Sequence, residues 1–243
     1  MYTAFFQNIG TLTSLLPLFL FLIFFKRNNR IEIRVILFYC CYSVINDFIL
    51  LTNENNPEYG GLIFFLLSLF TIIEYLCFSA VIFLLMNSSV FKRIIIYITP
   101  LFIIYSIYQY LIASSYIIDS LTITIENIII LSFCILFFFE QISKPEVTFI
   151  YFSYKFWLVL AILIYSTGTF FLFMYSSTMS NEQWEDWSLI NSVFSILKNA
   201  FFSIAIIMKK DNSDNNYLKK PFNEDIFGNP MEIDHSTNTD RHT

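Results

Sequence analysis

The chain has 243 residues, of which 56% are hydrophobic, 20% aromatic and only 14% charged. A water-soluble domain carries about a quarter charged residues, because polar groups must cover its surface. A bilayer removes that requirement, so the composition predicts a membrane protein. The formal net charge of −5 comes without a stripe of basic residues, which argues against a nucleic-acid partner.

Seven apolar segments are long enough to cross a bilayer, which takes about 20 residues in a helix. They are longer and more uniformly apolar than the alternating strands of a membrane barrel. The predicted helices are 5–25, 31–51, 61–86, 94–113, 121–140, 154–176 and 188–208. The sequence therefore predicts an all-α fold, a polytopic membrane bundle of seven transmembrane helices over residues 1–208.

The prolines and the first basic residues give further information about the first and fourth helices. Pro17 lies inside the first segment and predicts a kink, whereas Pro100 is expected near the start of the fourth helix, where proline is tolerated. Lys26 and Arg27 follow the first apolar run instead of preceding it. The first segment is therefore expected to be a retained helix and not a cleaved signal.

Basic residues gather in alternate connections, which predicts the orientation. Four lie at the first connection, and others lie at the third, at the fifth and after the seventh helix. The second, fourth and sixth connections carry acidic residues and no Lys or Arg. Cytoplasmic loops are the ones enriched in Lys and Arg, so the N-terminus is expected outside and the C-terminus inside. Residues 209–243 are polar and predict a disordered cytoplasmic tail.

The residues that usually bind metals are placed unfavourably for a metal centre. The four cysteines lie in apolar runs without CxxC spacing, and His235 and His242 lie in the polar tail. The cysteines are expected to be small hydrophobic side chains within the membrane. The pattern argues against intramembrane hydrolases that hold zinc with histidines.

Ionisable residues inside membrane helices are costly and by default suggest a functional site. Four stand in the predicted helices, namely Asp47, Glu74, Glu126 and Lys198. Lys198 shares a polar face of the last helix with Asn191, Ser195 and Asn199, at steps of three and four residues. By depth, Glu74 is the expected ion-pair partner of Lys198. Asp47 and Glu126 are expected to line one outward-facing polar region above that pair.

Three classes of function are compatible with these charges. The favoured hypothesis is a sensor or ligand-binding protein that passes its state to a protein partner, since no complete catalytic motif is present. A small solute or proton-coupled carrier using Glu74, Asp47 and Glu126 is the second. The third is a structural membrane subunit in which the ion pair only sets helix register, because a buried pair need not stabilise a fold.

Two sharper hypotheses for Lys198 are less well supported. A lysine in the last of seven helices, with a carboxylate at similar depth in the third, is the arrangement of a retinal Schiff base and its counter-ion. Phe194 stands where microbial rhodopsins carry an acid or a small polar residue, and the sixth helix has no proline, so no retinal cofactor is expected. A Ser195–Lys198 hydrolase pair is the other, but its spacing is that of any polar helix face.

Short motifs relate the chain to a family. They are Ile73-Glu74-Tyr75, Phe156-Trp157 with Gly168, Ile190-Asn191, and Leu197-Lys198-Asn199. With them the chain resembles seven-helix inner-membrane proteins of the Bacteroidota, a family with no assigned activity. The resemblance implies a multi-pass protein of the bacterial cytoplasmic membrane and implies no mechanism.

Overall fold

The computed structural model describes residues 2–24, 30–53, 60–112, 120–143, 153–176 and 181–208. The described chain is all-α, as predicted. Its seven helices are α1 (Tyr2–Ile23), α2 (Ile31–Asn53), α3 (Gly60–Leu85), α4 (Ser89–Ile112), α5 (Ser120–Ile142), α6 (Tyr154–Ser176) and α7 (Asn181–Ile207). The tail predicted at 209–243 lies outside the described residues.

The helix boundaries differ most from prediction at two starts. The predicted range 154–176 matches α6, whereas α4 begins at Ser89 instead of 94 and α7 at Asn181 instead of 188. Both extensions contain polar residues that hydropathy excludes from a membrane span. A helix satisfies its own backbone hydrogen bonds whatever its polarity, so it continues past the apolar run.

Pro100 corrects a second expectation. It lies in the middle of α4 and not near its start. Proline removes one backbone donor inside a helix, but membrane helices tolerate it when neighbouring groups and local adjustments satisfy the freed carbonyl. Pro17 likewise lies inside α1, and the helix continues through it.

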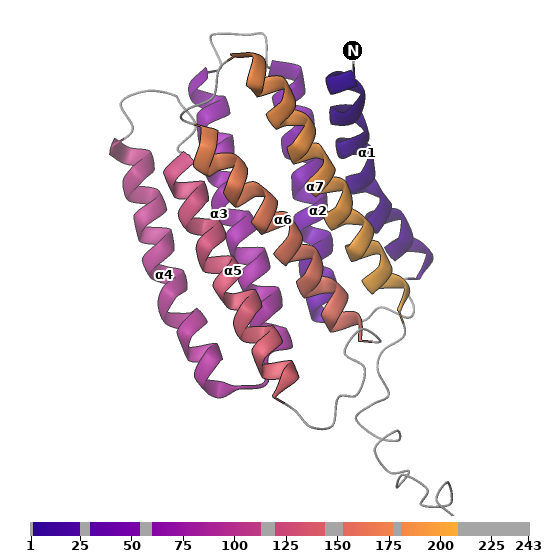
Figure 1. Cartoon of the computed structure of the whole chain (residues 1–243), viewed down its shortest axis with the longest axis vertical. Coiled ribbons are helices and arrows are strands. Elements are labelled where there is room, and N and C mark those ends of the chain that lie inside the picture. Colours follow the sequence, from indigo (N-terminus) through magenta and orange to yellow (C-terminus); the bar gives the residue numbers. More distant parts are fainter. Residues whose placement is uncertain are drawn as a thin grey trace, which may run out of the picture. The chain divides into compact units, whose positions relative to one another are not determined.

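The helices form one bundle, in which α4 lies at one side and α1 at the other (Figure 1). Helix α4 packs against α3 and α5, and α1 packs mainly against α7 and also against α2. Helices α5, α6 and α7 follow one another across the front of the view, with α3 and α2 behind them. Helix α3 contacts α2, α4, α5 and α6, so it is the central helix of the bundle.

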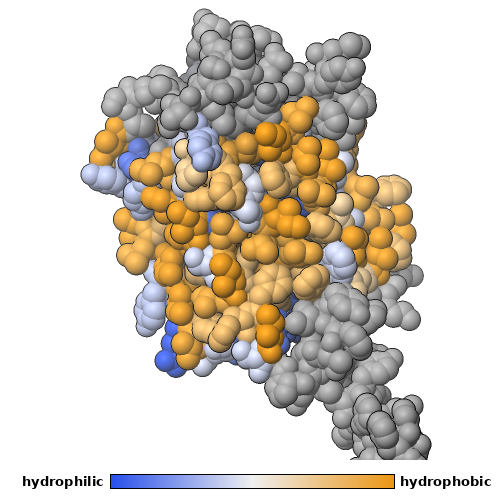
Figure 2. All heavy atoms as spheres, in the orientation of Figure 1, coloured by the Kyte–Doolittle hydropathy of each residue, from blue (hydrophilic) through white to orange (hydrophobic). Residues whose placement is uncertain are grey.

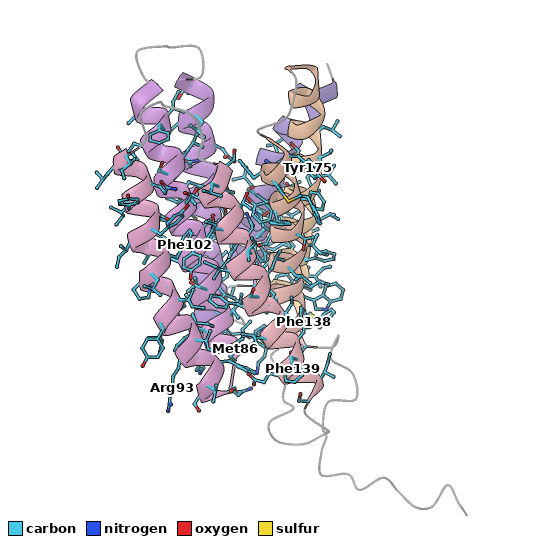
Figure 3. The ribbon with its side chains drawn as sticks, turned by 60° about the vertical axis from the view of Figure 1, so that its left-hand side comes forward. Met86, Arg93, Phe102, Phe138, Phe139 and Tyr175 are labelled. Atoms are coloured by element: carbon cyan, nitrogen blue, oxygen red, sulfur yellow. The ribbon has the colours of Figure 1, made fainter. Side chains whose placement is uncertain are left out.

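The core is built from apolar and aromatic side chains of these inner faces. Phe78, Val81 and Ile82 of α3 are almost fully buried, and Leu158 and Ile162 of α6 are fully buried. Aromatic rings extend the packing toward α4, where the Phe102 and Tyr75 rings lie with centroids 4.2 Å apart. Figure 3 shows Phe102 about midway along α4. Close packing of this kind is a main source of helix association in a bilayer, since lipid is as apolar as the core.

The outer surface of the bundle is hydrophobic. Figure 2 shows a broad hydrophobic belt across the visible face. Large apolar side chains stand exposed on several helices, for example Phe38 on α2, Leu101 on α4 and Ile135 on α5. Among the described residues, six helices are long and apolar enough to cross a membrane, and the described apolar part of α1 is the shorter Leu12–Ile23. The protein is an integral membrane protein with several helices in contact with lipid.

Apart from Lys198, basic side chains of the described chain lie at the end of the bundle where α2, α4 and α6 begin. We call this the basic end. It carries Arg34 near the start of α2, Arg93 near the start of α4 and Lys155 near the start of α6. Figure 3 places Arg93 at this end and Tyr175 of α6 near the opposite one.

Two polar contacts join helices near the basic end. Glu140 of α5 accepts hydrogen bonds from the backbone N–H groups of Asn87 (3.0 Å) and Ser88 (3.2 Å), in the short connection between α3 and α4. Tyr154 of α6 donates to Glu32 of α2, and the Arg30 guanidinium lies 3.9 Å from the centre of the Tyr154 ring. The sequence patterns did not single out these residues. Their role follows only from the packing of the helices.

Candidate functional site

Lys198 lies at the middle of the bundle and is only 4% exposed. The position follows from its place on α7, whose polar face at this level turns toward α2 and α6. Its Nζ donates a hydrogen bond of 2.6 Å to the hydroxyl of Tyr39 on α2. The same Nζ lies 3.7 Å from the centre of the Tyr165 ring on α6, which is cation–π geometry. The ammonium is thus held by two tyrosines.

Glu74 of α3 completes this arrangement from the other side. The Tyr39 hydroxyl donates to Glu74 Oε1 at 2.6 Å while it accepts from Lys198. A phenol hydroxyl has one proton to donate and two lone pairs, so it can serve both charges at once. Among the described residues, Lys198 forms no direct ion pair with a carboxylate. Glu74 is the carboxylate with the largest electrostatic interaction with Lys198, and the Tyr39 hydroxyl stands between the two groups.

Tyr165 adds a fourth helix to the same group. Its hydroxyl interacts with the Glu74 carboxylate, and its ring covers the ammonium of Lys198. We call Tyr39, Glu74, Tyr165 and Lys198 the polar centre. It joins α2, α3, α6 and α7, which are widely separated in the chain. One positive and one negative group lie within it, so the centre can be neutral overall without contact with water.

Asp47 lies two turns from Tyr39 along α2 and is only partly buried. Its carboxylate interacts electrostatically with Lys198 and with Glu74. Asp47 is therefore a second acidic group on the side of the polar centre that is farther from the basic end. It would help to compensate the Lys198 charge if Glu74 became protonated.

Glu126 of α5 lies on the other side of α3 and is 3% exposed. Its charged neighbour is Glu74, and no interaction between Glu126 and Asp47 is found among the described residues. The outward-facing polar region expected to be lined by both carboxylates therefore stays a prediction. The central helix α3 separates them, and Glu74 is the group near both.

Asn199 forms hydrogen bonds that its place on the polar face of α7 did not predict. Its Nδ2 donates to Thr13 Oγ1 (3.3 Å) and to Ser14 Oγ (3.1 Å) on α1. Adjacent residues of a helix point in directions about 100° apart, so Asn199 faces α1 while Lys198 faces the polar centre. The remaining predicted members of the stripe, Asn191 and Ser195, are partly buried and lie two turns and one turn from Lys198.

A small cavity lies between α3, α4 and α5, toward the end opposite the basic end. Its volume is about 40 Å³ and it is partly open. Hydroxyl, amide and aromatic side chains line it together with apolar ones, namely Phe64, Leu67, Ser68, Thr71, Ser106, Gln109, Tyr110, Thr122 and Ile123. We call it the α3–α4–α5 cavity. Ligand pockets for organic molecules are about 300–1,000 Å³, so this one has room only for water-sized groups.

The sequence patterns missed the two tyrosines of the polar centre as partners of Lys198. Tyr39 belongs to a polar stripe of α2 that also contains Ser43, Asn46 and Asp47. That stripe could have indicated that Tyr39 faces the interior of the bundle. Trp157 and Tyr165 drew attention only as aromatic residues that could line a retinal pocket around Lys198, because an aromatic side chain alone does not indicate contact with a particular ion. Within the described ranges, no three His, Cys, Asp or Glu side chains gather closely enough to hold a metal ion.

Comparisons of the chain with protein-family models, with curated proteins and with solved structures gave no match.

Proposed function

We propose that the protein is a membrane sensor in which the polar centre holds one of two arrangements of the bundle. One observation carries the proposal, namely the hydrogen-bonded chain from Lys198 Nζ through the Tyr39 hydroxyl to Glu74 Oε1. It fastens α7 to α2 and α3 through a single shared hydroxyl. If either Lys198 or Glu74 loses its charge, the other charged group is no longer stabilised in its buried position, and the helices can change their arrangement. A switch between two arrangements of this kind is a two-state element.

We propose further that all seven helices span the bilayer, with the N-terminus outside and the C-terminus inside. The segregation of Lys and Arg supports this orientation, since the basic end would then be cytoplasmic. The resemblance to Bacteroidota proteins supports a place in the bacterial cytoplasmic membrane. The sensor would pass its state to a protein partner or respond to a small ligand. The proposal includes no catalytic residue, no cofactor such as retinal, and no nucleic acid.

The sensor proposal is tested by the distance between two spin labels on purified protein in lipid nanodiscs. Val90 at the start of α4 and Ile207 at the end of α7 are exposed and suit the labels. We expect Tyr39→Phe, which removes the shared hydroxyl, to shift the measured distance. Tyr42→Phe is the matched control, because the Tyr42 hydroxyl has no hydrogen-bond partner among the described residues. An unchanged distance in Tyr39→Phe would mean that the centre is only structural.

A proton-coupled carrier is the second candidate, and the buried carboxylate of Glu126 beside Glu74 favours it. Carboxylates in series are the usual groups of intramembrane proton relays. Vesicles containing the purified protein, with a potassium diffusion potential and a pH-sensitive dye, separate the two candidates. Proton flux that is lost in Glu74→Gln supports the carrier. A protein that carries no flux and co-purifies with a stoichiometric partner supports a sensor or a structural subunit.

A further inference from the structure

The α3–α4–α5 cavity has a polar group that the protein does not satisfy. Ser106 is 6% exposed and lines the cavity, and its Oγ has no hydrogen-bond partner among the described residues. The hydroxyls of Ser68 and Thr71 already donate to carbonyls of their own helix. A buried hydroxyl without a partner is costly, above all in a bilayer. Ser106 therefore needs a partner that enters the cavity.

The size of the cavity selects that partner. A water molecule needs about 10–15 Å³ of such space, so a cavity of about 40 Å³ holds about three. Ser106 and Gln109 on α4 and Thr122 on α5 supply polar side chains around it. Water can both donate to and accept from such groups. A lipid chain would satisfy none of them.

Glu126 lies one helical turn from the cavity. Thr122 and Ile123 line it, and Glu126 follows them on the buried face of α5. No hydrogen bond to the Glu126 carboxyl is found among the described residues, and its charged neighbour is Glu74. The ionisable groups that face it are Glu74 and Tyr75 from α3 and Tyr165 from α6, and none is a cation. A carboxylate in these surroundings must be solvated or protonated.

We propose that the α3–α4–α5 cavity holds a short file of water through which Glu126 exchanges protons with the aqueous phase at the end opposite the basic end. Glu126 is six residues from the start of α5, or about 9 Å along the helix, so few waters bridge the distance. The protonated carboxyl gives its proton to the adjacent water, which becomes hydronium and passes the proton outward. The reverse step regenerates the acid. The proposal is independent of whether the polar centre works as a sensor.

Infrared spectroscopy of the protein in nanodiscs tests the exchange. The carbonyl stretch of protonated Glu126 is assigned by its loss in Glu126→Gln. We expect this band to shift to lower frequency immediately when H₂O is replaced by D₂O. Ser106→Leu, which fills the cavity, should delay the shift, whereas Ser106→Ala leaves the cavity open and should not. A band that is absent at every pH at which the protein stays folded, or that shifts equally fast in Ser106→Leu, would overturn the proposal.

A second measurement tests for water in the cavity without a variant that fills it. Ser106→Cys is close in size to serine and is probed with Ag⁺, a small cation that blocks thiols and does not cross lipid. Mass spectrometry of the peptide after unfolding and maleimide treatment reports the blocked fraction. We expect Ser106→Cys to be blocked and Ile104→Cys, which is exposed on the lipid-facing side of the same helix, to remain free. Equal labelling of the two cysteines means a dry cavity and contradicts the proposal.

Discussion

At the scale of single residues, the hydroxyl of Tyr39 decides how two buried charges meet. Lys198 and Glu74 come from α7 and α3, and the hydroxyl from α2 fits between them with two hydrogen bonds of 2.6 Å. Hydrogen bonds that involve a charged group are roughly twice as strong as neutral ones. A neutral side chain thus has the central place in a charged site.

We expect Tyr39→Phe to lower the free energy of unfolding by about 1–3 kcal/mol, because it leaves both charged groups without their shared partner. Tyr42→Phe makes the same chemical change one turn along α2, at a hydroxyl without a partner among the described residues, and should be near neutral. Thermal unfolding of both variants in detergent measures the difference. Equal stability of the two variants would show that the Tyr39 hydroxyl is dispensable.

Lys198 and Glu74 should depend on each other although they do not touch. Lys198→Met leaves an uncompensated buried carboxylate, which costs about 3–5 kcal/mol. Combining it with Glu74→Gln removes the second charge, and the double variant should recover folded yield. The measurement is a double-mutant cycle of yield and thermal stability. If the double variant is no better than the worse single one, the two charges are not coupled through Tyr39.

At the scale of helices, the contact between α6 and α7 depends on the absence of a side chain. A Cβ placed on Gly168 would lie 2.2 Å from Cδ2 of Phe194, which is far closer than atoms approach. The Phe194 ring therefore packs directly on the backbone of α6. Small residues that allow such close approach are typical of membrane helix interfaces. The contact sets the distance between the helices that carry Tyr165 and Lys198.

Gly168→Ala should destabilise the bundle by about 1–3 kcal/mol, the usual cost of overpacking. Replacing Phe194 by Ala as well makes room for the methyl group, so Gly168→Ala should cost less in that background. Gly60→Ala is the control, because no atom lies within 4 Å of a Cβ built there. Thermal unfolding of the variants in detergent measures these differences in stability. A Gly168→Ala protein as stable as Gly60→Ala would contradict the close contact.

At the scale of the whole molecule, the alternation of charge along the chain agrees with the alternation of helix direction. The described basic residues Arg34, Arg93 and Lys155 lie at one end because α2, α4 and α6 all begin there. An added or missing helix in the middle of the chain would place them at both ends. The basic end is therefore a consequence of the helix order. The enrichment of Lys and Arg in cytoplasmic loops predicts that this end faces the cytoplasm.

Reporter fusions test this orientation directly. We expect fusions after Gly60, Ser114 and Ser180 to report the outer side, and fusions after Ser88, Ser143 and Asn212 to report the cytoplasm. The expectation follows from the preference of basic loops for the cytoplasmic side. A cytoplasmic signal from Ser114 would be incompatible with seven spans and an external N-terminus.

The sequence by itself determined the class of the protein and the number of helices found in the described residues. Composition and run length suffice for this, because a bilayer imposes one length and one kind of surface on every span. Periodicity also shows which residues share a face of α7. Hydropathy did not predict where α4 and α7 begin, because a helix can continue through polar residues.

Only the tertiary structure decided which polar groups meet. Depth places Glu74 beside Lys198, but the rotation and order of the helices bring Tyr39 between them and Tyr165 over the ammonium. The same packing turns Asn199 toward α1 and puts α3 between Asp47 and Glu126. A helix pattern gives the height and the direction of a side chain relative to its own axis. The direction relative to the other helices depends on how all the side chains pack together, and no single segment contains that information.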